Sequence, residues 1–302
     1  MADSAEGEEE DAGIPLLDKD ELDVDLTHRQ IEKIENLDHL HKIETLCLRR
    51  NVIQKIEGLE TLVTLEDLDL YDNQIEKIEN LESLVNLKVL DLSFNTIKVI
   101  ENIGSLTKLQ KLFFVQNRIS RIKNLTNLTS LTMLELGANK IRVIDGLNSL
   151  VNLESLFLGK NKISKLENLG RLKKLRLLSI QSNRITKLEG LEDLENLEEL
   201  YISHNGIKVI EGLEKLVNLN TLDLASNEIT RIENLSHLNK IEEFWFNNNL
   251  LSSWNDLESL TKIETLQTIY LEGNPIASDV NYRRKVKLAL PFLKQIDATL
   301  TR

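Results

Sequence analysis

Asparagine returns at a fixed interval through most of this 302-residue chain. Members of the series lie 22 residues apart, at positions Asn51, Asn73, Asn95, Asn117, Asn139, Asn161, Asn183, Asn205, Asn227 and Asn249. Arg29 stands one interval before the series, and Asn274 follows it after 25 residues. A sustained period of this length is typical of a repeat architecture in which each unit stacks on its neighbours. The sequence therefore predicts twelve stacked units.

Apolar residues keep the same period as the asparagines. An apolar residue lies three and five positions before each Asn, and Ile lies two positions after it in nearly every unit, as in Leu68, Leu70 and Ile75. This is the leucine-rich-repeat pattern, L-x-x-L-x-L-x-x-N-x-I. The L-x-L portion is a short strand with both leucines on one face, and only stacking can bury that face. We therefore expect an α/β repeat solenoid, a horseshoe with a parallel β-sheet on its concave face.

Two turns are expected in every unit. The Asn side chain carries donors and an acceptor, which can satisfy backbone groups enclosed by the sharp turn after the strand, so we predict a stacked structural Asn ladder. Seven residues later almost every unit has Asn or Gly, the residues that best tolerate a left-handed backbone, as at Asn80, Asn102 and Gly146. The convex side has few residues left in each unit, which favours short 3₁₀ turns over α-helices.

The chain divides into three parts on this reading. Residues 1–21 form an acidic tail that we expect to be disordered, residues 22–276 hold the twelve repeats, and residues 277–302 form a cap over the last coil. The cap is predicted to contain a helix from Asp279 to Leu290, with Ser278 or Asp279 as its N-cap and Pro291 as its stop. Tyr282, Val286, Ala289 and Leu290 share the helix face that would close the core.

Charge and composition limit the partners. The net charge is −12, and residues 1–25 account for ten of these charges, so the repeats themselves are nearly neutral and offer no global attraction to nucleic acid. The sequence has no long apolar run for a membrane span and no signal peptide at its N-terminus. Cys47 is the one cysteine, which excludes an intrachain disulfide.

Residue patterns for catalysis or cofactor binding are not found. The five histidines, of which His39 and His41 lie nearest each other, have no metal-ligand spacing. No G-x-S-x-G, P-loop or G-x-G-x-x-G motif occurs. We therefore expect no catalytic, cofactor or metal site, and no enzymatic activity.

The strand residue between the two leucines points away from the core and onto the concave surface. From the second unit onward this position reads Cys47, Asp69, Asp91, Phe113, Glu135, Phe157, Ser179, Tyr201, Asp223, Trp245 and Tyr270. Five of the eleven are aromatic, in a chain with thirteen aromatic residues. Tyr71, Phe94, Val115 and Glu243 lie beside the row. Exposed aromatic residues among acids predict a protein-binding surface, although some of these rings could instead shield the sheet from water.

Several segments resemble a known family closely. The stretches "LDLYDNQIEKIENLE", "LESLFLGKNKISKLENL", "ELYISHNGIKVIEGLE", "EEFWFNNNLLSSWNDL" and "NYRRKVKLALPFLKQIDAT" are similar to the protein phosphatase 1 regulatory subunit 7 family of leucine-rich-repeat proteins. The resemblance implies a concave face that binds the catalytic subunit of this serine/threonine phosphatase. It also implies control of phosphatase activity and maturation, a ternary complex with a small inhibitor protein, and a location in nucleus and cytoplasm.

The resemblance carries over motif by motif onto the concave row. It implies partner contacts by Asp91 in "LDLSFN", Phe113 in "LFFVQN", Glu135 in "LELGAN", Phe157 in "LFLGKN", Asp223 in "LDLASN", Glu243 and Trp245 in "EEFWFN", and Tyr270 in "IYLEGN". A scaffold for a ciliary, cytoskeletal or ribonucleoprotein partner is the alternative, and such a partner would select other residues at these positions. RNA binding is disfavoured because basic residues do not gather on this row.

Overall fold

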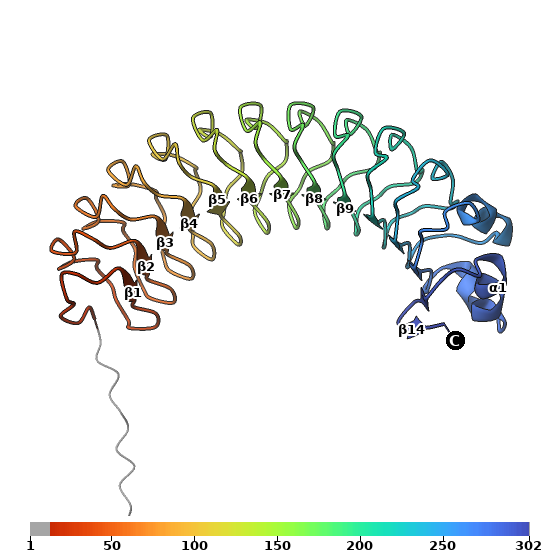
Figure 1. Ribbon diagram of the computed structural model, residues 1–302, viewed down its shortest axis with the longest axis horizontal. Helices are drawn as coiled ribbons and strands as arrows, with labels where there is room; N and C mark the ends of the chain where they lie inside the picture. Colours follow the sequence, from red (N-terminus) through yellow and green to blue (C-terminus); the bar gives the residue numbers. More distant parts are fainter. Residues whose placement is uncertain (1–12, 302) are drawn as a thin grey trace, which may run out of the picture.

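The computed structural model describes residues 13–301, which form a crescent-shaped solenoid (Figure 1). Each coil contributes one short strand to the inner curve, and strands β1 to β12 pair in parallel and in sequence order. Their bounds are Asp23–Asp25, Thr45–Cys47, Asp67–Asp69, Val89–Asp91, Lys111–Phe113, Met133–Glu135, Ser155–Phe157, Leu177–Ser179, Glu199–Tyr201, Thr221–Asp223, Glu243–Trp245 and Thr268–Tyr270. The predicted horseshoe with a concave parallel sheet is confirmed.

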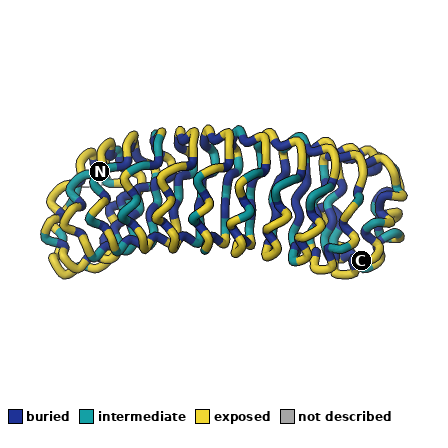
Figure 2. The backbone as a smooth tube through the Cα atoms, turned by 90° about the horizontal axis from the view of Figure 1, so that it is seen from above, coloured by how far each residue is buried: buried dark blue, intermediate teal, exposed yellow. Residues whose placement is uncertain are grey.

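Strand register follows from the repeat length. Equivalent residues pair directly, so that Leu68 lies beside Leu90 and Asp69 beside Asp91. The central residue of each strand is buried and its neighbours face outward, because side chains alternate along a strand. Leu and Ile from all coils form one continuous core, and Phe114, Phe244 and Phe246 are buried within it. Figure 2 shows this buried interior running the length of the solenoid between exposed turns.

The predicted Asn ladder is present and hydrogen-bonds each coil to the one before it. In Asn139, Nδ2 donates to the carbonyl oxygens of Phe114 (2.8 Å), Leu136 (3.1 Å) and Gly137 (3.1 Å). Its Oδ1 accepts a hydrogen bond from the Ile119 N–H at 2.9 Å. At the C-terminal end Asp297 takes the acceptor role, receiving the N–H groups of Leu271 and Glu272. The ladder satisfies backbone groups that the turn would otherwise bury unpaired.

The second turn also has the predicted left-handed backbone, with φ of 57° at Asn102 and 70° at Gly146. Where the residue is Asn, its Nδ2 bonds back to the preceding coil, as from Asn102 to the Ile78 carbonyl oxygen at 2.7 Å. The convex side then makes consecutive 3₁₀-type bonds, for example from Leu87 N–H to the Leu84 oxygen. The longest 3₁₀ helix, η1, spans Trp254–Leu260.

The N-terminal end differs from expectation. Residues 1–12 of the expected disordered tail lie outside the described residues, but disorder is the wrong prediction for residues 13–21. Ile14 and Leu17 pack against the core, and His39 Nε2 lies 3.0 Å from the Leu17 carbonyl oxygen. The physical reason is that the first coil has no preceding neighbour, so this short apolar stretch covers its open end.

The α-helix of the C-terminal cap begins later than predicted. Helix η2 spans Pro275–Ser278, and α1 spans Tyr282–Ala289 rather than starting at Asp279. The N-cap is Asn281, not Ser278 or Asp279, because Asp279 instead closes a turn in which its Oδ1 accepts the Asn281 N–H. The predicted face of the helix is confirmed, with Val286 and Leu290 fully buried. Strands β13 (Gln295–Ile296) and β14 (Thr299–Leu300) complete the sheet.

Tyr282 links the cap to the end of the Asn ladder, because its hydroxyl donates to Asp297 Oδ2 at 2.9 Å. We expect Tyr282→Phe to lower the free energy of unfolding by about 1 kcal/mol, since it leaves one buried carboxylate oxygen unpaired. Urea unfolding measures the difference. Tyr71→Phe is the control, because the Tyr71 hydroxyl makes no hydrogen bond within residues 13–301; equal stability losses in the two variants would contradict the assigned role.

Candidate protein-binding face

The residues between the two leucines of each repeat are here called the concave strip. They lie on the inner surface of the crescent, as the alternation of side chains along a strand predicted. The concave strip comprises Cys47, Asp69, Asp91, Phe113, Glu135, Phe157, Ser179, Tyr201, Asp223, Trp245 and Tyr270. All are partly exposed except Asp223, whose exposed fraction is 3%. Phe113, Phe157 and Trp245 therefore face outward from the sheet and do not belong to the core.

The acids of the concave strip are held in place by the backbone. Each carboxylate accepts a hydrogen bond from the N–H two residues further on, as Asp91 does from Ser93 (2.8 Å) and Asp223 from Ala225 (3.0 Å). This is the side-chain mimic of a tight turn, and it fixes the carboxylate at the end of the strand. One oxygen of each acid is thereby committed to the turn. The second oxygen of Asp69 pairs with Arg49 and Asp223 is buried, so the second oxygens of Asp91 and Glu135 are the ones left for a partner.

Glu135 has the most perturbed carboxyl group of the strip. It pairs in register with Phe113 on one side and Phe157 on the other. Burial between these rings raises its pKa to about 7, against the opposing effect of the hydrogen bond from the Gly137 N–H at 2.7 Å. Gly137 makes this arrangement possible, because a Cβ there would lie 2.7 Å from Glu135 Oε1. The site is suited to a cation, which would favour the ionised carboxylate.

A shallow hollow of about 560 Å³ lies over the centre of the concave face. Its lining includes Phe94, Glu135, Phe157, Asp223 and Trp245. Small residues at the two positions before the ladder Asn, such as Gly137, Gly159 and Ser182, also line it. Five of the twelve predicted site residues thus border one hollow, while the other seven lie outside its lining.

Three aromatic residues cluster at the C-terminal end of the strip. The Trp245 ring contacts Tyr201 and Tyr270 edge-on, with centroids 6.3 and 5.7 Å apart. Hydrogen bonds orient the two tyrosines, from Tyr201 to Glu199 and from Gln295 to the Tyr270 hydroxyl. The Trp245 indole N–H is buried and has no hydrogen-bond partner within residues 13–301, an arrangement that costs stability. Glu243, two residues before Trp245, is partly exposed beside this cluster.

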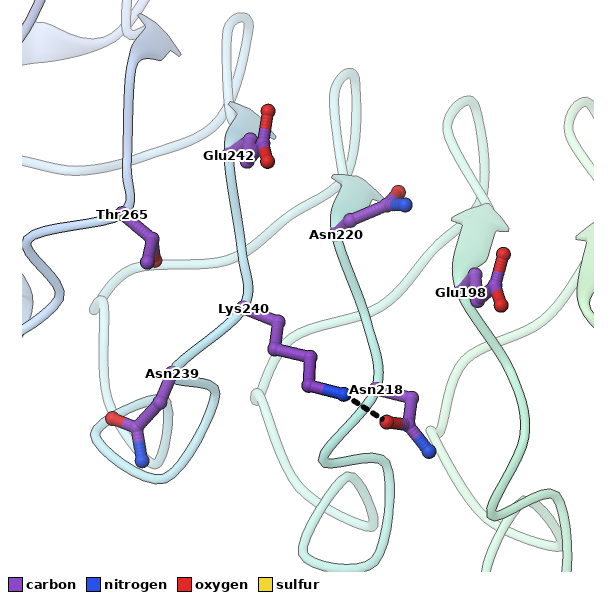
Figure 3. Close-up of a pocket in the computed structure, with 7 residues that line it drawn as sticks. All are labelled: Glu198, Asn218, Asn220, Asn239, Lys240, Glu242 and Thr265. Carbon is purple, nitrogen blue, oxygen red and sulfur yellow. Dashed lines mark hydrogen bonds between the residues drawn. The ribbon is translucent and has the colours of Figure 1, made fainter.

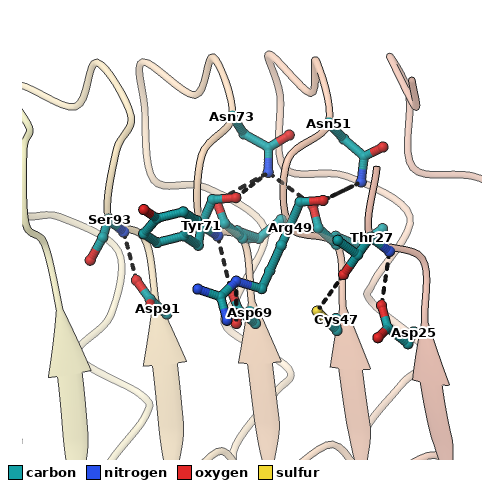
Figure 4. Close-up of polar contacts among 12 residues, drawn as sticks. Asp25, Thr27, Cys47, Arg49, Asn51, Asp69, Tyr71, Asn73, Asp91 and Ser93 are labelled. Carbon is teal, nitrogen blue, oxygen red and sulfur yellow. Dashed lines mark hydrogen bonds and ion pairs between the residues drawn. The ribbon is translucent and has the colours of Figure 1, made fainter. Parts of the chain in front are cut away.

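A second cluster lies at the N-terminal end (Figure 4). Arg49 stacks over the Tyr71 ring at 4.5 Å and pairs with Asp69 at 3.4 Å from Nε to Oδ2. The Tyr71 ring contacts Phe94, with centroids 4.8 Å apart. Phe94 is 41% exposed and has φ of 55°, a left-handed backbone that costs about 1 kcal/mol for such a residue. The same left-handed φ occurs at this position in the neighbouring coils, as at Asp72 and Gln116, so it belongs to the repeat turn, and the exposed ring is the feature particular to Phe94.

The sequence-based selection missed several residues of this face. Arg49, Gly137, Lys160 and His204 come from the two positions that precede each ladder Asn, and these positions also border the concave side. The fixed offset from Asn could have identified them. Asp223 was expected to be exposed, but Ser203 and neighbouring residues shield it, and burial raises its pKa.

Other kinds of site were also considered. Within residues 13–301, no group of three or more His, Cys, Asp or Glu side chains is placed to hold a metal ion. Of the helices in that part of the chain, none has the length and apolar content needed to cross a bilayer.

Known proteins support the fold along nearly the whole chain. A model of paired leucine-rich repeats, "Leucine Rich repeats (2 copies)", matches residues 41–83, 63–106, 85–129, 129–171, 151–194, 173–215 and 195–240. An internalin from Listeria monocytogenes is 27% identical, with a TM-score of 0.73 over 93% of this chain and 87% of that one. The functional domain of InlJ from the same bacterium is 22% identical, with a TM-score of 0.74, and covers 91% of this chain and 62% of that one, which shows the fold alone.

Curated relatives match over a shorter stretch. "Protein phosphatase 1 regulatory subunit 7" from Xenopus tropicalis and from Homo sapiens are each 62% identical over 37 residues. The match covers 12% of this chain and 11% and 10% of those relatives, about a tenth of their length. The resemblance to the regulatory subunit is confirmed over this 37-residue match. The repeat model, by contrast, covers about two thirds of the chain. The chain belongs to the leucine-rich-repeat family, whose solenoid is a scaffold for protein interaction.

Proposed function

We propose that this protein is a regulatory subunit that binds the catalytic subunit of protein phosphatase 1 on its concave face. The single observation that carries the proposal is the concave strip, in which preoriented aromatic rings alternate with backbone-held carboxylates. A partner surface with basic groups and apolar pockets complements such a strip. The name shared by the curated relatives supplies the identity of the partner.

Two groups on this face would gain from a partner. The Trp245 indole N–H lacks an acceptor, and the Glu135 carboxyl lacks a cation. A partner's carbonyl oxygen could accept a hydrogen bond from the Trp245 N–H, and a partner's Lys or Arg could pair with ionised Glu135. Both contacts would remove the free-energy cost of burying these groups unpaired, so they would contribute to the binding free energy. Control of phosphatase activity and maturation, and a location in nucleus and cytoplasm, belong to the same proposal. A ternary complex with a small inhibitor stays an expectation of the resemblance.

The test measures binding of the phosphatase catalytic subunit by calorimetry. We expect Phe157→Ala and Trp245→Ala each to weaken binding by about 2 kcal/mol or more, roughly thirtyfold, because central aromatic residues dominate such interfaces. Neither change empties the core, so the thermal unfolding temperature should change little.

Val217→Ala provides the matched control, since Val217 is 49% exposed and lies away from the strip. Wild-type affinity in the Phe157→Ala/Trp245→Ala double variant would discard this surface as the phosphatase site. Wild-type protein that binds no phosphatase, yet captures another partner through these same two residues, would favour a scaffold of different specificity.

A further inference from the structure

The segments that directly follow the strands in the chain are unusually rich in Lys and Arg in the central coils, although the net charge of the chain is −12. In the four central coils, residues 114–122, 136–144, 158–166 and 180–188 contain no Asp or Glu. Six cations of these segments, here called the basic stripe, are Arg118, Lys140, Arg142, Lys160, Lys162 and Arg184. Lys162 is half-buried and the other five are exposed.

Backbone hydrogen bonds hold the basic stripe in a regular stack. The N–H groups of Arg118, Lys140 and Lys162 each donate at 2.8 Å to an Ile carbonyl oxygen of the preceding coil, and that of Arg184 does the same. Successive cations are therefore spaced by about one strand separation, roughly 4.8 Å. Like charges at this spacing repel one another, and nothing in the fold requires them there.

Ion pairs surround the basic stripe. Two other cations of the same segments, Lys165 and Lys187, pair with Glu167 and Glu189 at 3.9 and 4.0 Å, and neither belongs to the stripe. In the coil before it, Lys98 pairs with Glu76 at 3.6 Å, and in the coil after it, Lys208 pairs with Glu228 at 3.6 Å. Within residues 13–301, the six stripe cations make no ion pair or side-chain hydrogen bond. Lys98 and Lys208 occupy the repeat position of Arg142, which is therefore neutralised in the flanking coils and unpaired in the stripe, and the six stripe cations are left for an external anion.

We propose that the basic stripe binds an extended acidic segment of a partner protein. Charge complementarity with an evenly spaced row of cations favours a chain of carboxylates lying across the coils. Lys160 also lines the concave hollow, so the basic stripe is continuous with the concave face and one partner could span both. The proposal does not depend on the identity of the protein in the concave face.

Single-stranded nucleic acid fits this surface less well. Its binding sites combine cations with exposed aromatic rings on which bases stack. Phe114 is the one aromatic residue in the four segments, and it is fully buried.

The chain's own acidic N-terminus is also a poor occupant. Gly13 is bonded to the Arg29 carbonyl oxygen in the first coil, and the basic stripe begins in the fifth, about 19 Å away at 4.8 Å per strand. Glu8 to Asp11 lie within five residues of Gly13, a reach of about 17 Å. The densest group of acids in that segment therefore reaches at most the first cation of the stripe and cannot lie along all four coils.

The test uses the full chain and fluorescence anisotropy of a labelled glutamate dodecamer, with a glutamine dodecamer as the neutral probe. We expect the glutamate peptide to bind in a salt-sensitive manner and the glutamine peptide not to bind. The variant Arg118→Gln/Lys140→Gln/Lys162→Gln/Arg184→Gln should bind the glutamate peptide at least about tenfold more weakly. Circular dichroism checks that it stays folded.

The matched control removes four charges from the opposite edge, with Lys88→Gln/Lys108→Gln/Lys174→Gln/Lys240→Gln. Figure 3 shows part of that edge, where Lys240 Nζ donates to Asn218 Oδ1 at 2.7 Å. In other coils Lys108 Nζ donates to Asn86 Oδ1 and Lys174 Nζ to Asn152 Oδ1 at the same distance. We expect this variant to keep wild-type affinity for the glutamate peptide.

Four results would overturn the proposal. The first is no binding of the glutamate peptide, and the second is an equal loss in both quadruple variants, which would reflect net charge alone. The third is tighter binding of an oligouridine dodecamer with the same residue dependence, which would assign the basic stripe to nucleic acid. The fourth is about tenfold tighter peptide binding after deletion of residues 1–12, which would make the chain's own N-terminus the occupant.

Discussion

Asn139→Ala is expected to lower the free energy of unfolding by about 4 kcal/mol. The side chain is 7% exposed and makes four hydrogen bonds to backbone groups of two coils. Alanine leaves the Ile119 N–H and the Phe114 carbonyl oxygen without these partners inside the turn. Each buried group left unpaired costs about 1–3 kcal/mol, and a water molecule entering the vacated space offsets part of the total.

Urea unfolding of the variant and the wild type measures this effect. Asn148→Ala is the control within the same coil, because Asn148 is exposed and makes no side-chain hydrogen bond within residues 13–301. It should change stability by less than about 0.5 kcal/mol. A loss at position 139 no larger than that at position 148 would show that the ladder does not stabilise the stack.

Glu135→Gln is expected to stabilise the free protein at pH 8 by up to about 3 kcal/mol, and to have little effect near pH 4.5. The folded-state pKa of Glu135 is about 7, raised from 4.5 by burial. Between these two values the folded state keeps a proton that the unfolded state has released. The wild-type protein is therefore most stable below pH 4.5 and loses stability as the pH rises through 7, and the Gln variant avoids this loss.

Chemical unfolding of both proteins at pH 5 and pH 8 measures the change. Glu154→Gln controls for the general loss of a carboxylate, since Glu154 is exposed on the next coil. A Glu135→Gln stability difference that is the same at both pH values would rule out a buried titrating carboxyl. If the proposed partner places a cation at Glu135, binding should also strengthen from pH 6 to pH 8, because the ionised carboxylate is the form that attracts it.

The candidate face shows how far residue pattern alone can reach. Strand alternation placed Phe113, Phe157 and Trp245 outside the core, and the structure has them there. The same alternation could not reveal that Asp223 is shielded, or that Arg49 stacks on Tyr71, because both depend on side chains from adjacent coils. The basic stripe was likewise visible only after stacking, since its members are 22 residues apart in the chain.

The sequence by itself determined the repeat, its register, the Asn ladder and the left-handed turns at Asn102 and Gly146. These features are local to one 22-residue unit, and a spacing written ten times leaves a single way to stack it. The tertiary structure decided the ends and the surface: residues 13–21 over the first coil, the later start of α1 at Tyr282, the environment of Glu135 and the alignment of the basic stripe. Each of these depends on groups brought together from different coils or on an end that has no neighbour. Burial and charge are therefore set by packing between units, which the period of one unit does not encode.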